Sequence, residues 1–389
     1  MSETSPHFIE NKLLEMKKGA GTHSPSIASI RSKIPELEIS VDACFLSNPY
    51  ATDLFMQSMQ EDLIDTGKLR DVLEFYPTHN SGLAEVIGPQ LGVDSKNIFV
   101  ANGAIEIIQA VLHRFVRGSV VLSIPTFSSY YEFAPEGVKP VFYELSKEND
   151  FALDVSDYVK FVRENGAGAA ILINPNNPTG TYLTQVQVGE LLEELQDLSV
   201  VIIDESFIHF ASEGDDTIPS VGKLISKYPN LVVIKSMSKD FGIAGVRAGY
   251  GILSSDRVAE LLENGYLWNS SGLAEYFFRL YAQEDFQNKY GQVRQRYINE
   301  MKKFGEELGA INGIRVYPSQ ANFYLCEIEN GMSADDFFIA MLSRFGVYVR
   351  TCTDKIGLEK GAFVRIACRT EVENAKIIEA VKAVVGSSN

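Results

Sequence analysis

Short runs of β-branched and other apolar residues alternate with stretches of helical periodicity from about residue 92 onward. The apolar runs cover residues 97–100, 119–124, 140–145, 169–173, 198–203, 231–234 and 249–253, and helical stretches such as 104–115 and 186–196 separate most of them. Buried strands that alternate with helices form a mostly parallel sheet with helices on both faces. We therefore predict an α/β fold whose large domain holds a mostly parallel, seven-stranded sheet, with ligands bound at the carboxyl ends of its strands.

The pattern changes after residue 285. A long charged helix at 286–308 leads to strands at 313–317, 321–328, 346–350 and 362–367, with helices at 333–344 and 371–384. This pattern indicates a second, smaller α+β domain, because a chain of 389 residues is too long for one small core. We expect residues 56–280 to form the large domain and residues 281–389 the small domain, with residues 1–55 as an N-terminal segment that packs with the small domain.

Composition narrows the classes of partner. The net charge of −16 repels nucleic acid and anionic membranes, so an anionic ligand needs a local cationic site. The four cysteines show no CxxC spacing, which argues against a disulfide framework or a zinc site, and we expect no metal. The polar N-terminus lacks the apolar core of a signal peptide, and no stretch has the apolar length of a membrane span. These features predict a cytoplasmic enzyme that acts on small molecules.

Two candidate ligand loops follow predicted strands. Gly103 comes directly after one strand, and the amides of Ala104 and Ile105 begin a helix, where free N–H groups and the helix dipole favour phosphate. Taken alone, these residues also fit an ordinary turn before a helix. The segment 174–180, Asn-Pro-Asn-Asn-Pro-Thr-Gly, forms a rigid loop after another strand. Its amides could donate hydrogen bonds to an oxygen of an aromatic ligand, although a turn-rich loop would also explain it.

Two further loops carry charged residues. Asp204 ends the apolar run 200–203, where a buried carboxylate needs a cationic or proton-donating partner such as a pyridinium nitrogen. The alternative is that Asp204 caps the next helix. Lys239 lies just after the strand 231–234, where a desolvated amine becomes nucleophilic, and the flanking Ser236 and Arg247 suit a phosphate ester. The alternative here is a solvated lysine in a glycine-rich loop.

These four blocks, in this order, resemble the class I and II pyridoxal-phosphate aminotransferases of fold type I, over roughly residues 46–383. Arg247 follows Lys239 by eight positions, as it does in that family. The resemblance implies that Lys239 carries the cofactor as a Schiff base and transfers the proton, and that Asp204 pairs with the pyridinium nitrogen. It also implies contacts with the cofactor ring or its phosphate for Gly103, Ala104, Ile105, Phe127, Asn177, Phe207, Ser236, Ser238 and Arg247.

The same resemblance implies contacts with the substrate and with a second subunit. Tyr76 would reach the cofactor phosphate of the neighbouring subunit, so we expect a homodimer. Arg365 would bind the substrate α-carboxylate, and Asn48 lies where the N-terminal segment of the family closes the site. Arg350 and Asn322 are further candidate substrate-binding residues.

Within the family, segments 175–180, 204–210 and 319–323 resemble the branch of histidinol-phosphate aminotransferase and threonine-phosphate decarboxylase. The C-terminal pattern at 349–352, 357–358 and 364–370 leans toward the decarboxylase. Phe207 leans the same way, because it departs from the usual tyrosine, which would donate a second hydrogen bond to the ring oxygen. We predict an aminotransferase that moves an amino group between an amino acid and a 2-oxo acid through Lys239.

Two other readings stay open. The first is a decarboxylase of a phosphorylated or acidic amino acid, in which Arg350 and Arg369 could hold a second anionic group. The second is a cofactor-binding protein without catalysis, which the presence of Lys239 opposes. Both enzyme reactions use the same residues, so the motifs leave the broken bond, the substrate and the pathway open.

Overall fold

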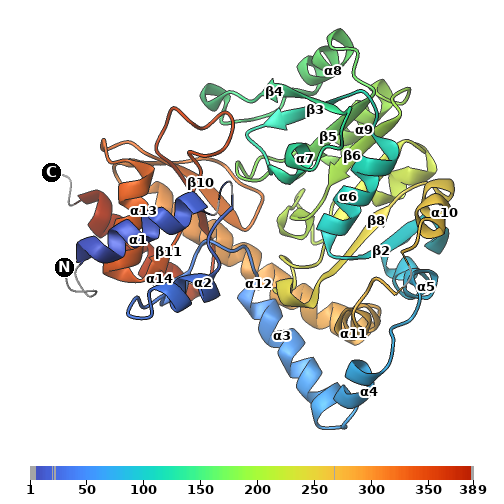
Figure 1. The fold of residues 1–389 in the computed structure, drawn as a ribbon, viewed down its shortest axis with the longest axis horizontal. Helices are drawn as coiled ribbons and strands as arrows, with labels where there is room; N and C mark the ends of the chain where they lie inside the picture. Colours follow the sequence, from blue (N-terminus) through green and yellow to red (C-terminus); the bar gives the residue numbers. More distant parts are fainter. Residues whose placement is uncertain (1–5, 20, 22, 267, 387–389) are drawn as a thin grey trace. The chain divides into compact units, whose positions relative to one another are not determined.

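The central sheet has seven strands in the order β2-β8-β7-β6-β5-β3-β4 (Figure 1). The computed structural model describes residues 6–386 apart from residues 20, 22 and 267. The strands are β2 (Ile98–Asn102), β3 (Ser119–Ile124), β4 (Lys139–Glu144), β5 (Ala169–Ile173), β6 (Val200–Asp204), β7 (Leu231–Ser236) and β8 (Ala248–Ile252). Strands β3 to β7 pair in parallel, whereas β8 is antiparallel to both its neighbours. This arrangement confirms the predicted mostly parallel, seven-stranded sheet.

Apolar side chains bury both faces of this sheet. In β6, Val201 and Ile203 belong to one apolar cluster, and Val200 and Ile202 belong to another. The first cluster includes residues of α5 (Asn80–Leu91), α8 (Val155–Glu164), α9 (Gln185–Glu194) and α11 (Gly272–Tyr281), and the second includes residues of α6 (Ala104–Phe115), α7 (Ser129–Glu132) and α10 (Ser255–Glu263). Because helices cover both faces, the strands are continuous apolar runs, and polar residues gather where the strands end.

Local sequence explains where α3 begins. The side chain of Asn48 accepts a hydrogen bond from the amide of Ala51 at 3.3 Å and caps α3 (Pro49–Met59), which begins with proline at its first position. A π-helical turn (Gln60–Ile64) and α4 (Leu69–Glu74) follow. This cap places Asn48, one of the candidate residues, at the start of α3.

The chain divides into two compact units. The larger consists of Ser47–Asn177 and Thr181–Tyr297 and contains the seven-stranded sheet. The smaller consists of the residues up to Leu46, Pro178–Gly180 and the residues from Ile298 onward. The long helix α12 (Glu284–Gly309) contributes residues to both units.

The smaller unit is an α+β structure. Its four-stranded antiparallel sheet has the order β12-β13-β10-β9, and a parallel pair joins β1 to β11. Its elements are α1 (Pro6–Gly19), α2 (Ile27–Lys33), β1 (Val41–Asp42), β9 (Ile314–Val316), β10 (Phe323–Ile328), α13 (Ala334–Phe345), β11 (Val347–Tyr348), β12 (Arg350–Thr351), β13 (Phe363–Ala367) and α14 (Glu371–Gly386).

The prediction of a single strand at 346–350 is wrong. The structure divides this stretch into β11 and β12, which lie in different sheets on either side of Val349. The reason is a change of partner, since β11 pairs with β1 whereas β12 pairs with β13. None of the helices in the described part of the chain combines the length and apolar content that crossing a membrane requires.

Candidate active site

Three of the four loops noted in the sequence follow strands that are neighbours in the larger sheet. The amide of Asn174, just after β5, donates to the carbonyl oxygen of Asp204 at 2.8 Å. The amide of Glu205, just after β6, donates to the carbonyl oxygen of Ile234 in β7 at 2.8 Å. Ser236 is the last residue of β7. The carboxyl ends of β5, β6 and β7 therefore bring these loops together at one edge of the sheet.

The fourth loop joins them through β8. Gly103 precedes α6 with a φ of 81°, and a Cβ atom there would lie 2.5 Å from an Nη atom of Arg247. Gly249 pairs with Ser236, and a Cβ atom on Gly249 would lie 2.8 Å from the backbone nitrogen of Ala104. The guanidinium group thus lies against the first turn of α6, and a helix N-terminus beside a cation favours an anion. Ser236 and the first turn of α6 adjoin the same stretch of β8.

Asp204 is a buried carboxylate whose two oxygen atoms accept hydrogen bonds from neutral groups. Its Oδ2 accepts from the Tyr130 hydroxyl at 2.7 Å, and its Oδ1 accepts from the Ser206 amide at 2.8 Å. Burial raises the pKa of Asp204 against the lowering effect of these hydrogen bonds. Phe207, rather than Asp204, is the N-cap residue of the following 3₁₀ turn, so helix capping does not explain this carboxylate.

Lys239 lies in the turn after β7, and its backbone is tied to the start of α3. The carbonyl oxygen of Lys239 accepts from the amide of Asn48 at 2.9 Å. The side chain of Asn48 is buried, and its Nδ2 atom has no hydrogen-bond partner among the described residues. A buried amide donor of this kind calls for an acceptor, such as an oxygen atom of a ligand. The amide of Ser238 donates to the Ser236 hydroxyl at 3.3 Å, which shapes the same turn.

The remaining candidates around the ring differ in burial. Asn176 is held by Thr126 and by the carbonyl oxygen of Pro125, at 3.0 and 2.9 Å, and the next residue, Asn177, is half-buried. Phe127 is half-buried against an apolar cluster of the sheet, and it follows the strand β3. The larger sheet therefore carries both ring-contact candidates in loops at the carboxyl ends of β5 and β3.

Two aromatic candidates, Phe207 and Tyr76, differ in their exposure to solvent. Phe207 is buried. Tyr76 lies between α4 and α5 and is 83% exposed, with its ring centroid 5.3 Å from that of Trp268. An exposed tyrosine of this kind has most of its ring available to a partner.

The smaller unit contains a group of three cations. Arg350 in β12 pairs directly with Arg365 in β13, and Lys355 follows in the next turn. Arg350 and Lys355 are only 7% and 8% exposed, and Nη2 of Arg350 donates to Asp354 at 2.6 Å. Burial, and then the charge of Arg350, lower the pKa of Lys355. Like charges directly opposite on a sheet are destabilising, so an anion beside these side chains would offset their repulsion.

Asn322 lies just before β10 in the same unit and is fully buried. Neither its Nδ2 nor its Oδ1 atom has a hydrogen-bond partner within the part of the chain that the structure describes. Its carbonyl oxygen accepts from the amide of Cys368, just beyond β13. A buried amide with both ends unsatisfied points to a ligand or an ordered water molecule. Arg369, by contrast, lies 3.6 Å from Glu373.

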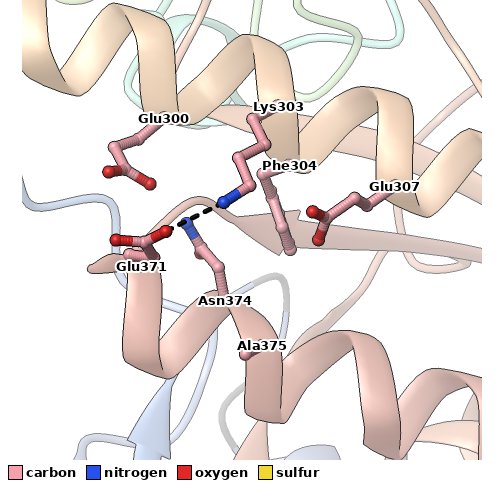
Figure 2. Close-up of a pocket in the computed structure, with 7 residues that line it drawn as sticks. All are labelled: Glu300, Lys303, Phe304, Glu307, Glu371, Asn374 and Ala375. Atoms are coloured by element: carbon pink, nitrogen blue, oxygen red, sulfur yellow. Dashed lines mark hydrogen bonds and ion pairs between the residues drawn. The ribbon is translucent and has the colours of Figure 1, made fainter.

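A hollow between α12 and α14 is a poor place for an anion (Figure 2). Its lining includes Glu300, Glu307 and Glu371, and the Nζ atom of Lys303 is bound to Glu371 at 2.8 Å. Three carboxylates around one paired lysine would repel a phosphate group. We therefore do not assign a phosphorylated ligand to this hollow.

Sequence reasoning missed three of these residues. Tyr130 and Ser206 hold Asp204, and Lys355 adds a cation beside Arg350. A signal existed for Lys355, because it lies five positions after Arg350 in a segment already noted for its arginines. No local pattern linked Tyr130 to Asp204, since 74 positions separate them.

The larger unit fits pyridoxal phosphate, the cofactor that the family resemblance implies. The phosphate suits the first turn of α6, where a side chain at Gly103 would fill the space beside Arg247. The pyridinium nitrogen suits Asp204, because a cation beside this buried carboxylate would offset its desolvation. The unpaired Nδ2 atom of Asn48 suits an oxygen atom.

Comparisons with known proteins identify relatives over nearly the whole chain. The family described as Aminotransferase class I and II matches residues 47–384. L-serine phosphate decarboxylase Cj1436c from Campylobacter jejuni is 50% identical over 374 residues, which cover 96% of each chain. L-serine phosphate decarboxylase from Sulfurospirillum multivorans is 44% identical over 374 residues, which cover 96% of this chain and 95% of the relative.

A solved structure agrees with these relatives. The structure of a decarboxylase from Sulfurospirillum multivorans superposes with a TM-score of 0.92 at 42% identity, and the match covers 99% of this chain and 100% of that chain. Histidinol-phosphate aminotransferase from Caldanaerobacter subterraneus is 32% identical over 78% of this chain and 82% of the relative, which confirms the branch.

These comparisons correct the predicted activity. The relatives that are 50% and 44% identical are named decarboxylases, and so is the structure with a TM-score of 0.92. The prediction of an aminotransferase is therefore wrong, and the findings favour the decarboxylase alternative. The fold and the branch are those that the motifs indicated, because both reactions use one set of cofactor contacts. The match over residues 47–384 shows that the chain belongs to the class I and II aminotransferase family, for which pyridoxal phosphate is the implied cofactor.

Proposed function

We propose that this protein is a pyridoxal-phosphate-dependent decarboxylase that converts O-phospho-L-serine to O-phosphoethanolamine and CO₂. The structural observation that carries the proposal is the group of three cations formed by Arg350, Lys355 and Arg365. Such a group suits a phosphate dianion better than a single carboxylate. The names of the relatives that are 50% and 44% identical supply the reaction and the amino acid.

The chemistry of decarboxylation favours placing these cations on the phosphate. CO₂ is uncharged, so a cation bound to the substrate carboxylate would stabilise the starting state more than the transition state and would slow the reaction. The phosphate keeps its charge throughout, and cations bound to it orient the substrate without this penalty. We therefore assign Arg365, together with Arg350 and Lys355, to the phosphate, although the aminotransferase resemblance alone would give Arg365 the carboxylate. The buried, unsatisfied amide of Asn322 is a further candidate contact for the substrate.

The chain's own residues have distinct tasks in this reaction. When bound, pyridoxal phosphate accepts the electron pair that is left when the bond from Cα to the carboxylate breaks. Lys239 would hold the cofactor through its Nζ atom until the substrate amine displaces it. The freed Nζ amine would then deliver a proton to the substrate Cα, in the place that the CO₂ leaves. Asp204 keeps the ring nitrogen protonated, and Gly103, Arg247 and the first turn of α6 bind the cofactor phosphate.

The supporting contacts of the cofactor are also proposals. Ser236, Ser238 and the amides of Ala104 and Ile105 would complete the phosphate site. Asn177 would donate to the ring oxygen, and Phe127 would stack on the ring, while Phe207 supplies no hydroxyl group there.

We also propose a homodimer in which Tyr76 contacts the cofactor of the second subunit. Tyr76, Phe75 and Leu73 are 83%, 66% and 70% exposed, although their side chains are largely apolar. A group of exposed apolar side chains in one segment is typical of a protein interface. Sedimentation equilibrium on the wild type tests the dimer. Titration with pyridoxal phosphate tests the contact of Tyr76, because the cofactor affinity should fall in Tyr76→Ala. A monomeric wild type would contradict it.

The decisive experiment measures CO₂ and amine products together. The protein is loaded with pyridoxal phosphate and given O-phospho-L-serine, O-phospho-L-threonine, L-serine or L-aspartate, with Lys239→Ala as the inactive control. The proposal expects O-phosphoethanolamine and CO₂ in equal amounts from O-phospho-L-serine, with the other compounds turned over far more slowly. Loss of the amino group without CO₂, or a preference for an unphosphorylated amino acid, would overturn it.

A further inference from the structure

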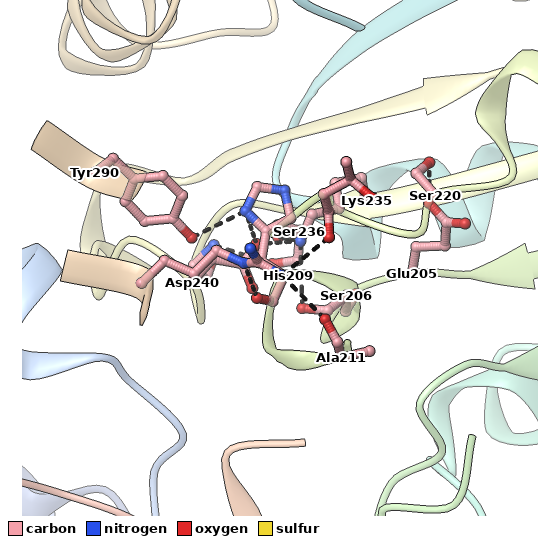
Figure 3. Close-up of polar contacts among 12 residues, drawn as sticks. Glu205, Ser206, His209, Ala211, Ser220, Lys235, Ser236, Asp240 and Tyr290 are labelled. Atoms are coloured by element: carbon pink, nitrogen blue, oxygen red, sulfur yellow. Dashed lines mark hydrogen bonds and ion pairs between the residues drawn. The ribbon is translucent and has the colours of Figure 1, made fainter. Parts of the chain in front are cut away.

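A buried ion pair flanks Lys239. Lys235, the penultimate residue of β7, is 1% exposed, and Asp240 is 0% exposed. The Nζ atom of Lys235 donates to the carboxylate of Asp240 and to the carbonyl oxygen of Ser236, the latter at 2.9 Å (Figure 3). Two opposite charges this far from water stabilise each other, and removal of one leaves the other uncompensated. The pair therefore anchors the chain on both sides of the proposed catalytic lysine, because Lys235 precedes Lys239 by four positions and Asp240 follows it directly.

The residues next to the pair hold the Lys239 turn at its far end. Phe241 follows Asp240, and its ring stacks on that of Tyr290 at 4.1 Å and meets that of Phe277 at 4.9 Å. These aromatic contacts leave the turn little freedom to shift, because each neighbour of Asp240 is packed or hydrogen-bonded.

The same pair reaches the loop that follows Asp204. The Nζ atom of Lys235 lies 3.5 Å from the carbonyl oxygen of Ser206, whose amide binds the Asp204 carboxylate. His209, in the turn Ile208–Phe210, shares a hydrogen bond between its Nδ1 atom and the hydroxyl of Tyr290 at 2.9 Å. Burial lowers the pKa of His209, so this imidazole is neutral. Lys235 is thus the charged link between the segment of Lys239 and the segment of Asp204.

Arg294 of α12 also binds the segment that follows Asp204. Its Nε atom donates to the carbonyl oxygen of His209 at 2.5 Å, and one Nη atom donates to that of Ala211 at 3.0 Å. Asp240 is the buried carboxylate at the centre of these elements. The charged and titratable groups that face it are Lys235, Lys239, His209, Tyr250, Tyr281, Tyr290 and Arg294.

From this geometry we propose that Lys235 and Asp240 are positioning residues. Their ion pair holds Lys239 at a fixed place relative to Asp204, and the carboxylate of Asp240 balances the positive charge of Lys235 beside the Lys239 amine. The proposal rests on the proposed function only in that Lys239 carries the cofactor. It adds two residues that need not touch the cofactor or the substrate.

The charge balance is tested by the pH at which the visible absorption of the bound cofactor changes. Asp240→Asn leaves the cation of Lys235 alone beside Lys239, so the midpoint should fall by about one pH unit or more. Lys235→Met in the Asp240→Asn background removes that cation, and the midpoint should return close to the wild-type value. Lys235→Arg keeps the charge and should leave the midpoint unchanged.

A purely structural role predicts a different pattern, in which the double variant is perturbed at least as much as Asp240→Asn. That pattern, or an unchanged midpoint in Asp240→Asn, overturns the charge balance. Lys227→Met is the matched control, because it removes a lysine from the exposed pair with Glu193 in the same unit and should leave the midpoint unchanged.

The positioning effect is tested by cofactor affinity, which also serves if Asp240→Asn alone does not fold. The double variant carries no unbalanced charge but lacks the link, so its dissociation constant for pyridoxal phosphate should rise about five-fold or more. An unchanged constant overturns the positioning role. If the wild type itself gives no visible band with pyridoxal phosphate, the proposed function fails, whereas a normal band without these differences contradicts only this inference.

Discussion

Tyr130→Phe removes one hydroxyl group from the site and leaves the packing of the ring in place. The hydroxyl donates to Oδ2 of Asp204 at 2.7 Å, and both side chains are buried. A hydrogen bond to a buried charged group contributes about 1.5–3 kcal/mol. Its loss should raise the pKa of Asp204 further and weaken the hold on the protonated ring nitrogen. The apoprotein loses this hydrogen bond as well, so only the extra strength of the bond beside the protonated ring counts toward cofactor affinity, and the dissociation constant for pyridoxal phosphate should rise about three- to ten-fold.

The same change has a pH-dependent effect on the protein without cofactor. Because burial raises the pKa of Asp204 above its unfolded value, ionisation of this group opposes folding, and stability falls as the pH rises above about 4. Tyr130→Phe raises the folded pKa further, so its cost should be absent below about pH 4 and largest near neutral pH. Stability relative to the wild type should then be lower by about 1.5–3 kcal/mol.

Two measurements check this reasoning. Apoprotein is titrated with pyridoxal phosphate by absorbance, and urea unfolding is followed at acidic and neutral pH. Tyr158→Phe is the matched control, because Tyr158 is equally buried beside the same sheet but its hydroxyl binds the carbonyl oxygens of Val121 and Ile171. Equal cofactor affinity in Tyr130→Phe and the wild type, with equal unfolding free energies at neutral pH, would refute the role given to this hydrogen bond.

Four other changes test separate parts of the site. Lys355→Met should raise the KM for O-phospho-L-serine about ten- to hundred-fold with little effect on unfolding, as steady-state assays would show. Gly103→Ala should weaken cofactor binding about ten-fold or more, because its φ of 81° disfavours a side chain and the methyl group would meet Arg247. Burial raises the pKa of Glu205 to about 7, so apoprotein stability should fall from pH 4.5 to 7, and Glu205→Gln should flatten that slope in urea titrations. Raising salt to about 0.3 M should not lower kcat/KM, because it screens the repulsion between the acidic chain and the substrate; a steep decline would contradict the buried cation site.

The strands of the larger sheet could be predicted because each is marked by a short apolar run in the sequence. The apolar run at 231–234 lies within β7 (Leu231–Ser236), and the run at 169–173 coincides with β5. The strand at 346–350 failed because Val347 and Arg350 have different partners, in β1 and β13, and pairing between distant segments leaves no trace in a local pattern. The same limit hid Tyr130, whose contact with Asp204 exists only in the folded chain.

The residues that hold the cofactor could be proposed from the sequence, whereas the reaction could not. Lys239, Asp204 and Arg247 follow a spacing that serves several reactions, because the cofactor supplies the chemistry. Which bond breaks depends on how the substrate is oriented, and we propose that this orientation depends on groups such as Lys355 at its far end. The C-terminal pattern at 349–370 and Phe207 were the signals that leaned toward decarboxylation, and they carried less weight than the shared motifs.

Charge distribution explains how such an acidic chain could take an anionic substrate. With a net charge of −16, the field of the whole protein repels phosphate, so binding must come from places where cations meet and water is excluded. Two candidate places among the described residues are Arg247 at the first turn of α6 and the group of Arg350, Lys355 and Arg365. The proposed cofactor has one phosphate, which we assign to the first. A phosphorylated amino acid, as we propose for the substrate, brings the second phosphate that this group of cations suits.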